Sequence, residues 1–533
     1  MRGAFRQSMT WLHTWSGLVF CWILYFMFVT GTLGYFDTEI DHWMMPEMPP
    51  AADVSPAEAY RVAQRRLEEE AEGADRWLVA HASGREEPHL RVFWQLPRPE
   101  GAEDVDPELL RGNEQLDAGT GKPLPELARS TGGGQLLYRM HYVLHYLDEQ
   151  AAFRLVGAIT MLMFLAMVTG IVVHKKIFKD FFTFRPARGQ RSWLDMHNLL
   201  SVSSLPFLLM ITYSGLIFMV TVWMPGIALG SYGFDTQKAQ AELGALANTA
   251  PPERSGETAE LLDLGVFIAQ VETEWGEGKL RSLNIQLPGD ANARVVANEK
   301  VSNGVSGFGR QIVFDGVSGE RLDAVAGAPN SAIGVAAVLI GLHEGLFAGP
   351  FLRWLYFVAG LVGTAMVATG AIYWTAKRRK PVADSGQSRG FRLVECLNIG
   401  TIVGLPVAVA AYFLANRLLP LGFEGRAEWE AHALFLVWGS CLLYPLFRPR
   451  LEAWRELTWA AALACGSLPI VNALTTDKHL LNSVAAGDRV MAAFDLTALA
   501  FGFLFAVLAS RLSDQQETAQ TVDDEAVDTV TAP

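Results

Sequence analysis

Apolar residues gather in blocks of about 20 along this chain, the length that a helix needs to cross the hydrocarbon core of a bilayer. Polar stretches separate the blocks. The pattern predicts eight membrane-spanning helices, at about residues 10–36, 153–174, 200–224, 352–374, 393–414, 431–447, 457–474 and 490–510. The first block is long and has no small-residue cleavage site at its end, so we expect a retained span and not a secretory signal.

Two hydrophilic segments, 38–150 and 226–335, interrupt the first four spans. Helical composition at 56–70 in the first and at 257–274 in the second is followed by alternation of apolar and polar residues, which is typical of strands. Each segment has the size of one small domain. The sequence therefore predicts a polytopic α-helical membrane protein with two small α+β external domains.

The first four spans contain an internal repeat. The same Asp-x-x-Ser/Thr-Gly turn occurs at 117–124 and at 315–322, and the distance between these turns also separates His145 from His343. Spans three and four thus repeat spans one and two. Such parallel repeats pack around a pseudo-two-fold axis along the membrane normal, with sites at their interface. The last four spans break the repeat and form an additional bundle.

Basic residues set the expected orientation, because Lys and Arg in short loops stay on the cytoplasmic side. They precede the first span, fill the loop between the second and third spans, and follow the fourth. With eight spans both termini are then cytoplasmic and the hydrophilic segments external. The net charge of −13 falls mostly in the external loops and in the tail after Asp514, so nucleic acid is not an expected partner. The apolar spans make the lipid bilayer an expected partner.

We accordingly expect seven segments. They are the first span (1–37), the first external domain (38–150), spans two and three with a basic cytoplasmic loop (151–225), the second external domain (226–335), the fourth span (336–380), four additional spans (381–513) and an acidic cytoplasmic tail (514–533). The four cysteines fall in or beside spans, and the sequence has no CxxC pair and no Walker loop. Neither a disulfide framework nor a nucleotide site is expected.

Six histidines are expected at the edges of the spans, in two layers. The cytoplasmic layer holds His13, His174 and His197, and the external layer holds His141, His145 and His343. A coordinating residue at a membrane edge is costly to bury and is a functional hypothesis by default. Two imidazoles from facing helices suit the axial positions of a haem used for electron transfer, so two symmetric pairs predict two haems. The competing interpretation, interfacial anchors, suits a single histidine better.

Four stretches of the chain resemble the PepSY-associated transmembrane family, especially its iron-uptake, ferric-siderophore reductase branch. They are Trp11–Gly17, Thr169–Lys176 followed by Phe178–Pro186, Trp193–Asn198 and Leu342–Phe357. The resemblance covers about residues 1–380. It implies two PepSY modules outside a bacterial inner membrane, a haem-binding core of four helices, and electron transfer that reduces ferric siderophores and releases Fe(II). The four extra spans depart from this pattern.

The sequence leaves two choices for the histidines that bind the cytoplasmic haem. Symmetry favours His13 with His197, whereas the family motif around His174 favours His174 with one of the two. On the external side His145 with His343 is the expected pair. His141 lies one helical turn from His145 but has no counterpart in the second repeat, so it is the weaker candidate.

The resulting hypothesis is an inner-membrane oxidoreductase with two b-type haems, and with its PepSY modules in the periplasm. It would pass electrons from an unidentified cytoplasmic or quinol donor to a periplasmic ferric chelate, above all a ferric siderophore. Two other functions are considered: a non-enzymatic PepSY module that binds or regulates another protein, and a transporter of an iron chelate.

Overall fold

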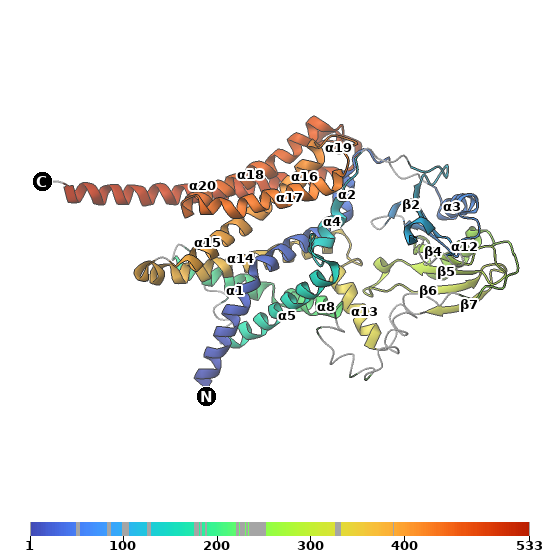
Figure 1. The fold of residues 1–533 in the computed structure, drawn as a ribbon, viewed down its shortest axis with the longest axis horizontal. Coiled ribbons are helices and arrows are strands. Elements are labelled where there is room, and N and C mark those ends of the chain that lie inside the picture. The colour runs from blue at the N-terminus through green and yellow to red at the C-terminus, as the bar shows by residue number, and fades with distance from the viewer. Residues whose placement is uncertain are drawn as a thin grey trace. The chain divides into compact units, whose positions relative to one another are not determined.

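A computed structural model describes residues 2–49, 54–82, 87–98, 106–124, 129–174, 184–186, 189–219, 252–325, 332–386 and 388–531, together with the isolated residues 181, 223, 230 and 233. The chain divides into two compact units (Figure 1). The helical unit comprises Met1–Met48, Leu127–Thr212 and Trp354–Pro533. The sheet unit comprises Pro49–Glu126 and Tyr213–Arg353.

Within the described residues, six helices are long and apolar enough to cross a membrane. They are Gly3–Gly34 in α1 (Arg2–Gly34), Glu149–Val173 (α5), Pro350–Asp384 in α14 (Pro350–Ser385), Arg389–Leu418, which contains α15 (Arg389–Ile402) and α16 (Gly404–Leu418), Arg450–Thr475 (α18), and Arg489–Ser513 in α20 (Arg489–Thr531). The expected span at 431–447 falls in α17 (Arg426–Leu443), which is not among them. The expected tail after residue 514 continues α20.

The third expected span is broken. Two helices, α7 (Gln190–Ser203) and α8 (Leu205–Ile217), overlap the expected span, meet at an angle of 67° and together make a possible seventh span. Residues 220–222 and 224 of the expected span lie outside the described residues. Pro206 follows the break and has no N–H to continue the helical ladder. The Ser204 hydroxyl donates to the Leu200 carbonyl, 2.7 Å away, which satisfies part of the interrupted backbone.

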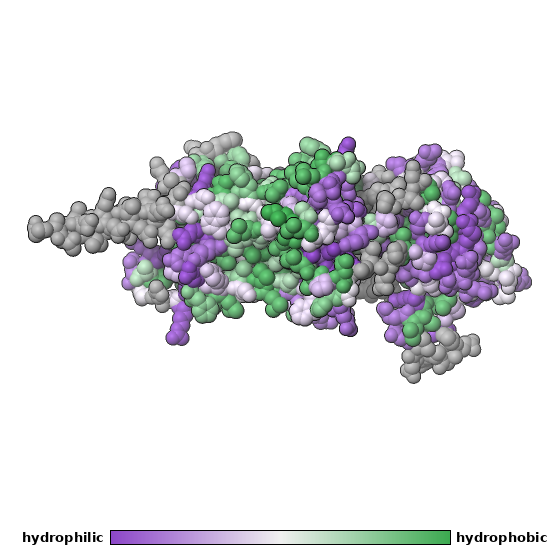
Figure 2. Space-filling model, turned by 90° about the horizontal axis from the view of Figure 1, so that it is seen from above, coloured by the Kyte–Doolittle hydropathy of each residue, from purple (hydrophilic) through white to green (hydrophobic). Residues whose placement is uncertain are grey.

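On the face seen in Figure 2, hydrophobic residues cover much of the helical unit, whereas hydrophilic residues dominate the sheet unit. Large apolar side chains are exposed on several helices, among them Leu463, Leu474 and Phe503. Exposed apolar surface of this extent is unusual in soluble proteins and is expected where helices face lipid.

The sheet unit is built on one antiparallel sheet of seven strands, in the order β3-β2-β1-β4-β5-β6-β7. The strands are β1 (Arg76–Ala82), β2 (Glu87–Gln95), β3 (Arg111–Leu116), β4 (Leu280–Gln286), β5 (Arg294–Glu299), β6 (Gln311–Asp315) and β7 (Arg321–Val325). Because β1 pairs with β4, with Val79 opposite Leu283, the two hydrophilic segments of the sequence share a single sheet.

Two helices share the core of this sheet. They are α3 (Pro56–Glu70) and α12 (Leu264–Trp275), each preceded by a side chain that caps its first turn: Ser55 for α3 and Asp263 for α12. Tyr60 from α3 and Phe267 from α12 are fully buried in one core together with Val79 and Leu283. The helix packing and the strand pairing thus both join the two halves.

The repeated turn motif has the same geometry in both halves of the sheet unit. Asp117 accepts hydrogen bonds from the backbone N–H and the hydroxyl of Thr120, both at 2.7 Å. Asp315 accepts the same two bonds from Ser318, at 2.7 and 2.9 Å. The glycine that ends each turn has a positive φ of 73° or 75°, a conformation that glycine adopts without strain.

After α1 the chain forms two short helices, α2 (Asp37–Met44) and α4 (Gly133–Met140), that pack against each other. The Asp41 carboxylate accepts a hydrogen bond of 2.8 Å from the Gly134 N–H. Burial raises the pKa of Asp41 from 3.8 to about 7, opposed by this bond and assisted by the charge of Asp37. The carboxyl group is therefore protonated in the folded protein at pH values where it is ionised in the unfolded chain.

Leu283→Ala should lower the free energy of unfolding by about 2–5 kcal/mol, because it opens a cavity in the core that both halves of the sheet share. Hydrogen–deuterium exchange of the full-length protein should then rise in β2 of the first half as well as in β5 of the second. Faster exchange confined to β5 would show that the halves are stabilised separately.

The raised pKa of Asp41 predicts a loss of stability with rising pH. The contribution of Asp41 to the stability of the folded protein is fully present below pH 3.8. It is lost as the pH rises through about 7, because the ionised form of the carboxyl group is then buried. Asp41→Asn keeps an acceptor for the Gly134 N–H but cannot ionise, so it should flatten this pH dependence. Melting temperatures at pH 5 and pH 8 measure it. Equal pH dependence in both proteins would contradict the assignment.

Candidate functional site

His13 of α1 and His197 of α7 lie next to each other in the helical unit. Their ring centroids are 6.4 Å apart, with the ring planes at 61°. The structure thus brings together the pair that the symmetry of the sequence favours.

Both imidazoles are oriented by backbone carbonyl groups. The Nδ1 of His13 is 2.8 Å from the Ala166 oxygen in α5, and the Nδ1 of His197 is 2.9 Å from the Met366 oxygen in α14. A carbonyl oxygen only accepts hydrogen bonds, so Nδ1 carries the hydrogen in each ring. The other nitrogen, Nε2, then has a free lone pair, the form in which histidine binds metals.

A Thr-Gly step shapes the wall against which each ring packs. A Cβ at Gly170 would be 3.1 Å from His13 Cε1, and a Cβ at Gly370 would be 3.0 Å from His197 Cε1. The hydroxyl of the preceding residue, Thr169 or Thr369, donates to the carbonyl four residues earlier at 2.8 Å, and it also lies 3.0 Å from the carbonyl that accepts the imidazole bond. Glycine therefore gives the ring room beside the helix, while the threonine contacts the shared acceptor.

The same arrangement surrounds His141, which lies between α4 and α5. Its Nδ1 is 2.7 Å from the Met27 oxygen of α1, and a Cβ at Gly31 would be only 2.5 Å from that nitrogen. The hydroxyl of Thr30 is 3.3 Å from the same Met27 oxygen. The local environment of His141 therefore matches those of His13 and His197.

His343 has a related environment within the sheet unit. It lies near the end of α13 (Ala332–Glu344), and a Cβ at Gly215 would be 3.0 Å from its Cε1. Its Nδ1 is 3.0 Å from the hydroxyl of Ser214, so a Ser-Gly step takes the place of Thr-Gly. Among the described residues, this contact between a histidine and a Thr-Gly or Ser-Gly step thus occurs four times.

His145 has different surroundings from these four histidines. Its ring stacks on Phe435 of α17, with centroids 5.6 Å apart and an angle of 11°. Its Nε2 is 3.4 Å from the carboxylate of Glu428. By this local geometry His141, and not His145, matches His343, although the spacing of the repeat had favoured His145.

His174 follows the last residue of α5. Its backbone N–H donates to the Gly170 carbonyl at 3.0 Å, which ends the helix one turn beyond the Thr-Gly step. Residues 175–180, which continue the family motif around His174 and include three lysines, lie outside the described residues.

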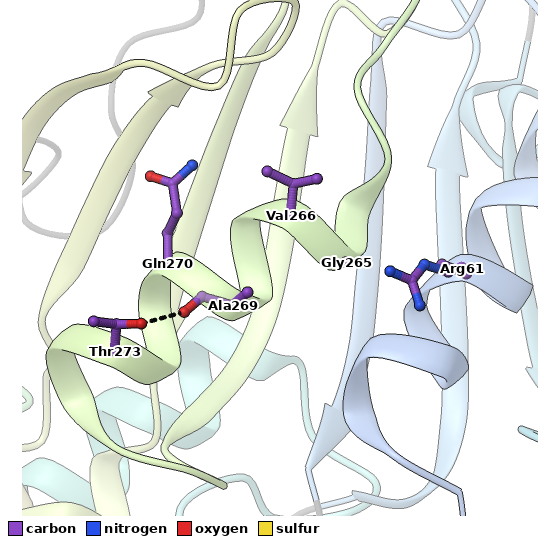
Figure 3. Close-up of a pocket in the computed structure, with 6 residues that line it drawn as sticks. All are labelled: Arg61, Gly265, Val266, Ala269, Gln270 and Thr273. Carbon is purple, nitrogen blue, oxygen red and sulfur yellow. Dashed lines mark hydrogen bonds between the residues drawn. The ribbon is translucent and has the colours of Figure 1, made fainter.

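A shallow hollow lies between α3 and α12 of the sheet unit (Figure 3). It is lined by Arg61, Gly265, Val266, Ala269, Gln270 and Thr273. Arg61 is already paired with the Asp263 carboxylate at 3.0 Å, and the Thr273 hydroxyl donates to the Ala269 carbonyl at 2.8 Å. The lining therefore has no acid–base pair, and the hollow is not a candidate catalytic site.

In the described part of the chain no three His, Cys, Asp or Glu side chains form a group that could hold a metal ion. The candidate site consists instead of separate imidazole side chains, each oriented by its own hydrogen bond. The model of the PepSY-associated TM region matches residues 10–377, and this range contains all four histidine–glycine contacts. The chain belongs to this family.

A similar protein comes from Pseudomonas aeruginosa and is described as an uncharacterized protein, PA4219. It is 25% identical over 319 residues, which are 56% of this chain and 77% of that protein. The family match ends at residue 377, before the helices α15 to α20 begin. These helices, residues 389–531, are called the appended helices below.

Gly31→Ala should destabilise the protein by about 1–3 kcal/mol, because a methyl group there overlaps the ring of His141. Gly17→Ala is the matched control in the same helix, since a Cβ at Gly17 meets nothing within 4 Å. Thermal unfolding in detergent should show a lower melting temperature for Gly31→Ala only. Similar melting temperatures for the two variants would show that His141 does not pack closely on α1.

Proposed function

We propose that the protein is an electron-transfer oxidoreductase with two b-type haems, which reduces a ferric chelate, above all a ferric siderophore, and so releases Fe(II). The observation that carries the proposal is the pair formed by His13 and His197. Two imidazoles bound to opposite sides of one iron, each through a bond of about 2 Å, hold their ring centres roughly 6 Å apart. The observed separation is 6.4 Å.

The hydrogen bonds of the two rings support this assignment. Metal-bound histidines commonly donate their other ring N–H to a backbone carbonyl, which fixes the ring orientation and makes the coordinating nitrogen more basic. His13 and His197 have this bond already, to Ala166 and Met366. His13 and His197 would hold the haem, and the haem would supply one-electron transfer.

For the second haem we propose His141, whose ring a backbone carbonyl orients as in the first pair, and we keep His343 as a candidate from the spacing of the repeat. His145, the earlier candidate, packs on α17 and is a neighbour of this site. His174 would compete with His13 or His197 for the first haem. We favour His13 with His197, since these two rings already lie at a separation that suits one iron.

The remaining parts of the proposal rest on the family resemblance. The chain would lie in the bacterial inner membrane with both termini in the cytoplasm and the sheet unit in the periplasm. Electrons would come from a cytoplasmic or quinol donor. Iron(II) is softer than iron(III) and binds hard oxygen ligands less tightly, so reduction would favour its release from a siderophore.

The proposal is tested first by the reduced-minus-oxidised absorption spectrum of the purified protein, with haem counted per chain. Two b-type haems and reduction of a ferric siderophore by the reduced protein would support it. Folded protein without haem, expressed with ample haem supply, would support the non-enzymatic PepSY binding module instead. Uptake of a chelate by proteoliposomes without any reductant would support the transporter.

His197→Ala should lose one of the two haems and abolish ferric reduction, because His13 alone cannot supply both axial ligands. His479→Ala is the control, since His479 precedes the short helix α19 (Leu480–Ala486), far along the chain from the four contacts. A pyridine haemochrome assay and the rate of Fe(II) formation measure the two effects. A His197→Ala protein that keeps both haems and full turnover would refute the assignment.

A further inference from the structure

A cluster of buried charges lies in the helical unit, away from the pair His13 and His197. Three arginines are almost fully buried: Arg129, Arg417 and Arg426, with exposed fractions of 4%, 4% and 1%. Two acidic residues, Glu430 and Asp495, are fully buried. Buried charges cost solvation free energy, so they are usually retained for a specific geometry or function and not for stability alone.

The cluster first fixes the residues that precede α4. Arg129 donates to both oxygens of Glu47, at distances between 2.8 and 3.0 Å. Thr131 donates to Glu430 of α17, and Arg426 of the same helix donates to the Ser130 carbonyl at 2.9 Å. The segment 129–131 is therefore held between residue 47 and the appended helices.

The cluster also fixes α2, through Trp43. The guanidinium of Arg417 lies over the Trp43 ring, 3.8 Å from its centroid, and donates to the Trp43 carbonyl. On α20, Asp495 accepts a bond of 3.0 Å from the indole N–H, and Phe494 stacks on the ring with centroids 4.2 Å apart. Trp43 has no exposed surface.

From α2 and α16 the contacts lead to α4 and then to His141. Asp41 of α2 accepts from the Gly134 N–H at 2.8 Å, and Tyr412 of α16 donates to the Gly133 carbonyl at 2.8 Å. These bonds hold the first turn of α4, whose last residue is Met140. His141 is the next residue, and its ring must reach the Met27 carbonyl of α1. The orientation of α4 therefore determines where the imidazole of His141 lies.

We propose that the appended helices are a scaffold for His141, and that Arg417 and Glu430 are positioning residues for this haem ligand. The inference rests on the proposed function and assigns a role to helices that lie beyond the family match. If the appended helices only had to pack against α2 and α4, apolar side chains would serve as well, because they often stabilise a core as much as a buried ion pair does. Directional bonds to Trp43 of α2 and to Thr131, just before α4, instead fix one arrangement of these helices.

The test compares Arg417→Met and Glu430→Gln with a matched control, Glu395→Gln, in the full-length protein. Glu395 is also a buried acid of the appended helices, and it pairs with Arg379 at 3.1 Å. His141→Ala and His197→Ala identify which redox component belongs to which histidine. The readouts are the midpoint potential and the low-spin ferric electron paramagnetic resonance signal of each component.

We expect Arg417→Met and Glu430→Gln to shift or remove the component that His141→Ala removes, and to leave the component that His197→Ala removes unchanged. Glu395→Gln should leave the His141 component as it is. Arg417→Lys should lie closer to the wild type than Arg417→Met, since lysine keeps the charge although not the planar fork. Unchanged components in folded Arg417→Met and Glu430→Gln would overturn the inference, and so would equal loss of both components.

A second readout does not need haem. Hydrogen–deuterium exchange in residues 129–148 should rise in Glu430→Gln and Arg417→Lys, and stay at the wild-type level in Glu395→Gln. Equal exchange in all of these proteins would overturn the positioning role. A wild-type protein without haem would refute the proposed function separately, and the exchange experiment would still decide whether the appended helices hold this segment.

Discussion

Close approach of an imidazole to a helix backbone is the constraint on which the rest of the helical unit depends. A ring can donate to a carbonyl in the middle of a helix only where the side chain four residues later is absent, so glycine follows Ala166, Met366 and Met27 at that distance. The carbonyl still takes part in its own helix, because oxygen has two lone pairs. Backbone carbonyl groups thus accept directly from the rings of His13, His197 and His141, and the Ser214 hydroxyl takes this place at His343.

This constraint explains why most of the site could be anticipated from the sequence. The histidines, the Thr-Gly steps and the Ser-Gly step are all visible there, and their spacing in two repeats favours His13 with His197. The partner of each glycine could not be read, because that depends on which helix packs against which. His141 and His145 are four residues apart. Their environments differ because the ring of His145 stacks on Phe435 of α17, whereas the ring of His141 reaches the Met27 carbonyl.

The individual helices and strands could be predicted from the sequence, but the way in which they pack together could be predicted less well. Apolar blocks and alternating segments identify helices and strands from local composition. The bend between α7 and α8 comes from Pro206, a signal that is present but does not state an angle. The pairing of β1 with β4 joins segments that are far apart in sequence, and nothing in either strand specifies the other as its partner. Likewise, nothing in the sequence distinguishes the buried arginines from ordinary polar residues at helix ends.

The shared sheet has a consequence for biosynthesis. One edge of β1 remains without its native neighbour until β4 has been made, and all of α5, α7 and α8 lies between the two strands in the chain. An open strand edge readily pairs with foreign strands. The nascent protein therefore passes through a period in which its first module is vulnerable to aggregation and proteolysis, and completion of the sheet reports that the intervening helices have been synthesised. The pairing of β1 with β4 is thus a single folding event that the cellular quality-control machinery can detect.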